Sequence, residues 1–211
     1  MGGLRPAPRG RAALHGWGRG RRAGPAVAAR GLPCGGTLAP SAEPIGLMNP
    51  TIRLARAEDG DAIARIYNPC VLETTITFEE EAVSGLEMAR RIADVQEQGL
   101  PWLVAEADGQ LLGYAYATRF RPRAAFRHSV ESSVYLGLQA QGRGLGRLLY
   151  EDLLPRLKAA GRHAVVASIA LPHPHSVALH ERLGFRQVGV LREVGFKFGR
   201  WVDLGYWQRN L

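Results

Sequence analysis

The stretch Gln141–Gly146 reads QGRGLG and places three glycines between a strand-like run and a long leucine-rich run. Glycines let a backbone approach a ligand closely, and backbone N–H groups at a helix N-terminus favour a phosphate. Arg143 and Arg147 add positive charge that suits a pyrophosphate. The same composition is also typical of an ordinary tight turn with solvated arginines, so the hexapeptide alone leaves both interpretations open.

Three histidines form a second candidate group, at His173, His175 and His180. Their spacing is compatible with metal ligation. No cysteine or paired carboxylate stands nearby, and the prolines at 172 and 174 indicate a stiff turn. The sequence therefore predicts that no metal is bound here.

The surrounding elements are predicted from apolar periodicity. Strands are expected at 51–57, 102–107, 111–120, 129–136, 163–171 and 185–191, with a further strand and turn within 196–210. Helices are expected at about 60–72, 84–98, 144–160 and 175–183. This order indicates an α/β (α+β) domain in which helices flank a central mixed, twisted β-sheet.

Local signals refine the helices. Asp59 or Asp61 is expected to cap the first helix. In the third helix Pro155 is expected to kink or weaken the middle. Its core face is expected to hold five leucines, Leu145, Leu148, Leu149, Leu153 and Leu157.

The charge is concentrated at one end of the chain. The net charge of the 211 residues is +8, a value that often indicates a nucleic-acid partner. Residues 1–47 hold seven arginines and one acid, hence +6, whereas 48–211 hold 20 basic and 18 acidic residues, hence +2. The domain is nearly neutral, so nucleic acid is not expected as a partner. No apolar run is long enough to predict a membrane span.

The segment 1–47 is rich in Gly, Pro, Ala and Arg and shows no apolar periodicity. It is expected to be disordered, because it cannot bury enough apolar surface to offset its ordering entropy. It resembles neither a secretory signal nor a Ser-rich transit peptide. We expect Met48 to be the true start and 48–211 to be the domain. One cysteine, Cys70, lies in that domain and Cys34 lies in the extension, which favours a reducing cytoplasm.

Several stretches of the sequence resemble a known family. Gln141–Gly146 matches the Gln/Arg-x-x-Gly-x-Gly/Ala signature of the Gcn5-related N-acetyltransferases (GNAT), and it stands between a strand and a long helix as in that family. The stretches WLVAEADGQLLGYAY, VESSVYL, SVALHERLGF and GFKFGRWVDLGYWQ are similar to the phosphinothricin and methionine sulfoximine acetyltransferases. The resemblance covers about 51–210 and implies a GNAT fold, acetyl-CoA as cosubstrate and direct acetyl transfer to an amine.

The resemblance also implies site residues. The coenzyme is expected to contact twelve of them, Val134, Tyr135, Leu136, Gln141, Gly142, Arg143, Gly144, Leu145, Gly146, Arg147, His173 and Ser176. The similar enzymes usually have asparagine where His173 stands, so coenzyme affinity or its pH dependence is expected to differ here. Ser176 is expected as a helix cap or a coenzyme contact.

Glu131 and His180 are the expected catalytic residues. Strand alternation puts Glu131, Ser133 and Tyr135 on one face, away from Val130 and the other apolar residues of the strand. Glu131 would deprotonate the amine through water, and His180 would protonate the departing thiolate. An exposed glutamate and a histidine that packs within its helix are the structural alternatives.

The substrate is expected to be a small amino acid analogue bound by Phe78, Arg121, Arg123, Phe126 and Lys197. Arginines suit a carboxylate together with a phosphinate, sulfone or sulfoximine oxygen. For the arginines the alternative is a basic surface turn. Two other functions are left open: acetylation of a protein N-terminus or another amine, and a coenzyme A-binding or interaction module without catalysis. The resemblance is also compatible with a homodimer.

Overall fold

The computed structural model describes residues 50–211. The predictions for residues 1–47, namely disorder and a start at Met48, lie outside the described residues. Within 50–211 the order of elements is β-α-α-β-β-β-α-β-α-β-β, as predicted. The strands are β1 (Thr51–Leu54), β2 (Trp102–Ala107), β3 (Gln110–Arg119), β4 (Ser129–Leu136), β5 (Ala164–Leu171), β6 (Arg186–Lys197) and β7 (Arg200–Asn210). The helices are α1 (Gly60–Glu73), α2 (Gly85–Glu97), α3 (Leu145–Ala159) and α4 (Pro174–Arg182).

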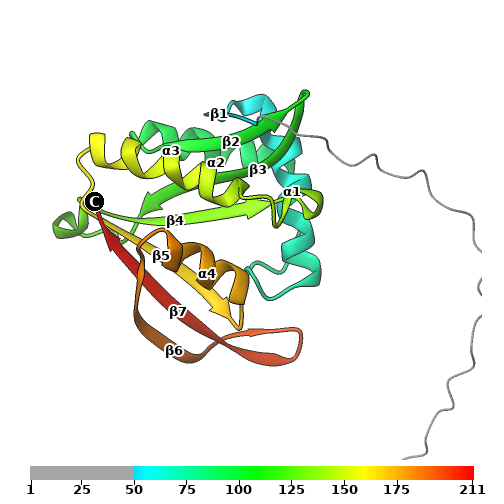
Figure 1. The fold of residues 1–211 in the computed structure, drawn as a ribbon. Helices are drawn as coiled ribbons and strands as arrows, with labels where there is room; N and C mark the ends of the chain where they lie inside the picture. Colours follow the sequence, from blue (N-terminus) through cyan, green and yellow to red (C-terminus); the bar gives the residue numbers. More distant parts are fainter. Residues whose placement is uncertain (1–49) are drawn as a thin grey trace, which may run out of the picture. The chain divides into compact units, whose positions relative to one another are not determined.

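The strands form one seven-stranded sheet in the order β1-β2-β3-β4-β5-β7-β6. Every neighbouring pair is antiparallel except β4 and β5, which run parallel and are joined through α3. The predicted mixed sheet is therefore confirmed. Figure 1 shows α3 and α4 on the near side of the sheet and α1 and α2 behind it.

The two faces of β4 look toward different helices. Ser132 reaches Tyr150 of α3 with an oxygen–oxygen distance of 3.0 Å. Tyr135 instead packs edge-on against Tyr67 of α1, with ring centroids 4.9 Å apart. Because strand residues alternate, Glu131 shares the α1 face with Tyr135, as the sequence predicted.

Two local predictions are wrong. The carboxylate of Asp59 does not cap α1, because it accepts the N–H of Arg56 at 2.7 Å and is paired with Arg53 at 2.8 Å. In α3, Leu148 is 40% exposed, whereas Leu154, which was not expected on the core face, is 5% exposed. Pro155 lies inside α3, which continues past it to Ala159.

Candidate active site

A cavity of about 1,440 Å³ opens between the second half of β4, the glycine loop, α3, β5 and α4. From β4 it is lined by Ser132 through Leu136, and from the side of α1 by Cys70 and Ile76. It therefore runs from the glycine loop, along β4, to the segment that follows α1. This is enough space for an extended ligand with reacting groups at its inner end.

The cavity exists because β4 and β5 separate. Their pairing covers Ser129 to Glu131, where Glu131 lies opposite Val166, and it ends there. From Ser132 to Leu136, β4 is paired with β3 alone. The edge of β4 that faces β5 therefore offers main-chain groups to a ligand in the cavity.

The glycine loop has the backbone that its sequence implies. Gly142 and Gly144 have φ angles of 73° and 80°, a region that favours glycine, and Gly144 immediately precedes α3. Both glycines line the cavity beside the N-terminus of α3. Gly146 serves packing in addition, because a Cβ there would lie 3.0 Å from Leu179 of α4.

Most of the predicted coenzyme residues are brought together. Ten of the twelve line the cavity, namely Val134, Tyr135, Leu136, Gln141, Gly142, Gly144, Gly146, Arg147, His173 and Ser176. Leu145 is placed in the hydrophobic core, and Arg143 lies on the exposed loop beside the cavity. Because these two residues do not line the cavity, its lining does not support their predicted contacts with the coenzyme.

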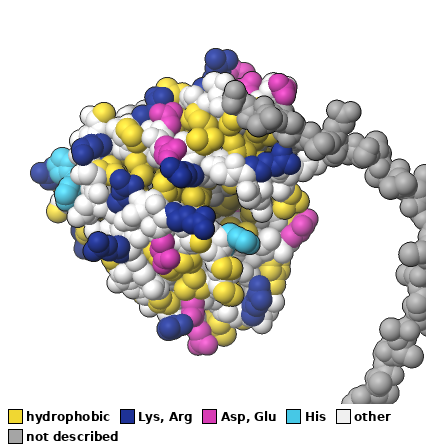
Figure 2. Space-filling view, viewed as in Figure 1, with side chains coloured by type: hydrophobic (Ala, Val, Ile, Leu, Met, Phe, Trp, Pro, Cys, Tyr) yellow, Lys and Arg dark blue, Asp and Glu magenta, His cyan; other side chains and the backbone are white. Residues whose placement is uncertain are grey.

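Further basic residues line the same cavity but were not predicted. They are Lys158 at the end of α3, Arg182 at the end of α4 and Arg209 on β7. Arg209 also donates to the main-chain oxygen of Leu183. Figure 2 shows basic side chains spread over the face formed by α3 and α4. No sequence motif joins these residues, because they come from three separate elements.

His180 is buried at 3% exposure in a hydrogen-bonded chain across α3 and α4. Its Nδ1 lies 2.8 Å from the Ser176 carbonyl oxygen, which can only accept, so Nδ1 carries the proton in the neutral ring. Its Nε2 then accepts from the Tyr150 hydroxyl at 2.9 Å, and Tyr150 lies 3.0 Å from Ser132. Burial lowers the pKa of His180. All four residues line the cavity.

Tyr150 and Ser132 were missed by the sequence analysis. Tyr150 is fully buried, and burial raises the pKa of its hydroxyl. Its position in α3 resembles that of any core aromatic residue at helical spacing. Only the fold shows that its hydroxyl meets both β4 and α4.

His173 caps α4. Its Nδ1 accepts the Ser176 N–H at 3.3 Å, so His173, and not Ser176, is the helix cap. Burial, with the nearby His175, lowers the pKa of His173. The neutral imidazole is the form that can accept this hydrogen bond.

Glu131 stands on β4 immediately before the open edge begins. It is half-buried, lies opposite Thr118 of β3 and precedes the cavity-lining Ser132. Its face is that of α1, whereas His180 approaches from α4. The two expected catalytic residues thus approach β4 from opposite faces of the sheet.

The five predicted substrate residues fall into two groups, neither of which lines the cavity directly. Arg121, Arg123 and Phe126 lie exposed between β3 and β4, where Arg121 stacks over Phe120 at 4.9 Å. Phe78 and Lys197 lie beyond Ile76, where Lys197 is only 2% exposed. The Lys197 ammonium donates to the Thr77 carbonyl oxygen at 2.8 Å.

Across residues 50–211 no group of three His, Cys, Asp or Glu side chains is arranged to hold a metal ion. Over the same range no helix is long and apolar enough to cross a membrane.

The family described as "Acetyltransferase (GNAT) domain" matches residues 52–205. The chain is 46% identical over 162 residues to a phosphinothricin N-acetyltransferase of Alcaligenes faecalis, covering 76% of this chain and 82% of that protein. It is 43% identical over 168 residues to an L-methionine sulfoximine/L-methionine sulfone acetyltransferase of Pseudomonas aeruginosa, covering 78% and 96%.

Solved structures agree with these sequences. A phosphinothricin acetyltransferase of the GNAT superfamily from Sinorhizobium meliloti, solved in complex with acetyl-CoA, has a TM-score of 0.75 and 42% identity. The match covers 78% of this chain and 89% of that one. The chain belongs to the GNAT acetyltransferases. Within that family it is similar to the phosphinothricin and methionine sulfoximine enzymes, as the sequence predicted.

Proposed function

We propose that this enzyme transfers the acetyl group of acetyl-CoA to the α-amine of a small amino acid analogue of the phosphinothricin, methionine sulfoximine or methionine sulfone type. The observation that carries the proposal is the single cavity that joins the glycine loop, the open edge of β4 and the segment around Ile76. Relatives of 42–46% identity bear the names of such enzymes.

The glycine loop and the basic side chains form the coenzyme half of the site. Main-chain N–H groups at Gly142 and Gly144, together with the N-terminus of α3, suit a pyrophosphate. Arg147, Lys158 and Arg182 add positive charge along the cavity. The open edge of β4 suits hydrogen bonding to the amide groups of an extended arm and to a developing oxyanion.

Glu131 is proposed as the general base. It lies on the α1 face, one residue before the lining Ser132, so a bridging water would connect its carboxylate to an amine bound near Tyr135. The neutral amine then attacks the thioester carbon directly, and the carbon–sulfur bond breaks as the amide forms.

His180 and Tyr150 are proposed to return a proton to the departing thiolate. Sulfur would take the Tyr150 hydroxyl proton as the carbon–sulfur bond breaks, and a solvent proton passed on by His180 Nε2 would then restore the hydroxyl, which leaves both residues neutral. Because burial lowers the pKa of His180, its imidazole is neutral at the start of this step and gives up such a proton readily.

Initial-velocity kinetics test the ternary complex. Double-reciprocal lines that intersect when amine and acetyl-CoA are both varied, with an N-acetyl product identified by mass spectrometry, are the expected result. Parallel lines would indicate an acetylated enzyme intermediate and contradict direct transfer.

A second candidate is acetylation of a protein N-terminus. A structure named as a ribosomal-protein-alanine N-acetyltransferase from Brucella melitensis is 39% identical, with a TM-score of 0.74. A peptide needs an open groove, whereas the relatives of 42–46% identity are named for free amino acid analogues, which favours a free amino acid. We further propose that the enzyme acts in the cytoplasm, where the thiol of Cys70 stays reduced.

A further inference from the structure

The segment 74–84, between α1 and α2, contains no helix or strand, yet it forms part of the cavity wall. Ile76 contributes its side chain to the lining next to Cys70 of α1. If acetyl-CoA occupies the end at the glycine loop, the amine must enter at this end. The position of Ile76 therefore affects which amines fit.

Lys197, at the end of β6, holds the residue that follows Ile76. Its ammonium donates to the carbonyl oxygen of Thr77 at 2.8 Å, across 120 positions of sequence. The side chain is 2% exposed and its Nζ lies 5.1 Å from the Phe198 ring centroid. A buried ammonium needs hydrogen-bond partners, so this contact fixes both the lysine and the loop.

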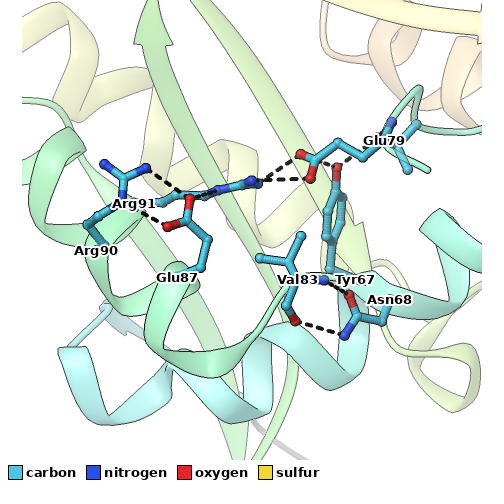
Figure 3. A network of polar contacts seen from close by, with 8 residues as sticks. Tyr67, Asn68, Glu79, Val83, Glu87, Arg90 and Arg91 are labelled. Carbon is cyan, nitrogen blue, oxygen red and sulfur yellow. Dashed lines mark hydrogen bonds and ion pairs between the residues drawn. The ribbon is translucent and has the colours of Figure 1, made fainter. Parts of the chain in front are cut away.

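A second set of contacts, from α1 and α2, holds Thr77 and Glu79; Figure 3 shows those of Tyr67 and Arg91 with Glu79. The Tyr67 hydroxyl lies 2.7 Å from the hydroxyl of Thr77 and donates to Glu79 at 3.0 Å. Arg91 of α2 forms two hydrogen bonds to the Glu79 carboxylate, of 2.8 and 3.1 Å. Burial raises the pKa of Tyr67, so its hydroxyl remains a donor.

Two further contacts hold this segment, one near its end at Val83 and one in its middle at Phe78. The Asn68 side chain donates to the carbonyl oxygen of Val83 at 3.0 Å and accepts its N–H at 2.8 Å. Phe78 lies against the backbone of Gly195, where a Cβ would come within 2.5 Å of its ring. The segment is thus held by α1, α2 and β6 together.

We propose that Lys197 is a positioning residue of the amine site, which holds Thr77 and thereby places Ile76 in the cavity wall, and that it does not bind the substrate carboxylate. This inference rests on the proposed function. It implies that Lys197, Tyr67, Glu79 and Arg91, by holding this segment, determine which amines fit in the cavity.

The test compares Lys197→Met with Arg147→Met, which removes a positive charge that lines the cavity in the first turn of α3, beside the glycine loop. Lys197→Met should raise the KM for methionine sulfone on the order of ten-fold, because it removes a hydrogen bond from a charged donor, and leave the KM for acetyl-CoA unchanged. Arg147→Met should do the reverse. An unchanged amine KM in Lys197→Met would overturn the inference.

A substrate without the carboxylate separates positioning from direct binding. The carboxamide of methionine sulfone is measured beside the acid, as a substrate or as a competitive inhibitor. Equal weakening of both by Lys197→Met supports positioning, whereas weakening of the acid alone shows an ion pair with the carboxylate and contradicts it. Wild-type protein that acetylates no amino acid would instead refute the proposed function.

Gly195→Ala provides an independent variant if Lys197→Met does not fold. Its new methyl group must displace the Phe78 ring, and it leaves Lys197 in place. The same rise in amine KM without a change in acetyl-CoA KM is expected. A wild-type amine KM in folded Gly195→Ala would show that the placement of this segment does not control amine fit.

Discussion

The two ends of the cavity are built in different ways. The coenzyme end consists of one short loop whose shape comes from two glycines in the left-handed region, Gly142 and Gly144, followed directly by α3. The amine end consists of an irregular segment held by side chains from α1, α2 and β6. A site built from local backbone tolerates little change in sequence, whereas a wall held by distant side chains can be altered one contact at a time.

The largest effect is expected at Glu131, the proposed general base, which directly precedes the cavity-lining Ser132 on β4. Glu131→Gln should reduce kcat on the order of 10²–10⁴-fold, since the amide cannot take a proton from the amine. Steady-state kinetics at saturating acetyl-CoA measure this loss. Glu58→Gln, the same change on an exposed turn before α1, is the control. Full activity in Glu131→Gln would remove Glu131 from its role.

At the coenzyme end, Gly144→Val should raise the KM for acetyl-CoA at least ten-fold. A β-branched residue is strained at a φ of 80°, and its side chain obstructs the approach of the backbone to a phosphate. Gly109→Val introduces the same strain at a φ of 73° in the β2–β3 turn. A similar loss of thermal stability in both variants, with a changed KM in Gly144→Val alone, is the expected pattern. An unchanged KM in Gly144→Val would contradict a phosphate-binding loop.

The stability of the protein is predicted to depend on pH because His180 is buried on the α3–α4 side. Burial places its folded-state pKa below the ordinary value of 6.5, so the unfolded chain binds the proton first as the pH falls. Stability should therefore be complete above about pH 6.5 and decrease below it, down through the folded-state pKa. Thermal unfolding at about pH 7.5 and 5.5 should show a smaller loss in His180→Gln than in wild type. Equal losses would show that His180 is not the titrating group.

The smallest expected effect is a difference in amine KM between substitutions at two neighbouring arginines of α2. Both Arg90 and Arg91 are paired with Glu87, but only Arg91 also reaches Glu79 (Figure 3). Arg91→Ala should raise the amine KM a few-fold, and Arg90→Ala should leave it unchanged, because exposed helical ion pairs contribute little. Equal KM values for the two variants would show that Glu79 does not hold the amine wall.

The comparison also explains what could be predicted from the sequence. The order of elements was correct, and ten of the predicted coenzyme residues line one cavity, because strand and helix periodicity and the hexapeptide are local signals. Tyr150, Arg182 and Arg209 were missed because they meet at the cavity only after three elements, α3, α4 and β7, have packed together. The Lys197–Thr77 contact joins residues 120 positions apart, which no periodicity can indicate.

The central claim is acetyl transfer to a free amino acid analogue, and thiol release from acetyl-CoA tests it most directly. The panel comprises phosphinothricin, methionine sulfoximine, methionine sulfone, ordinary amino acids and short peptides. The account predicts turnover with the first three and none with peptides. Turnover with peptides alone, or none with any amine despite binding of acetyl-CoA, would contradict it.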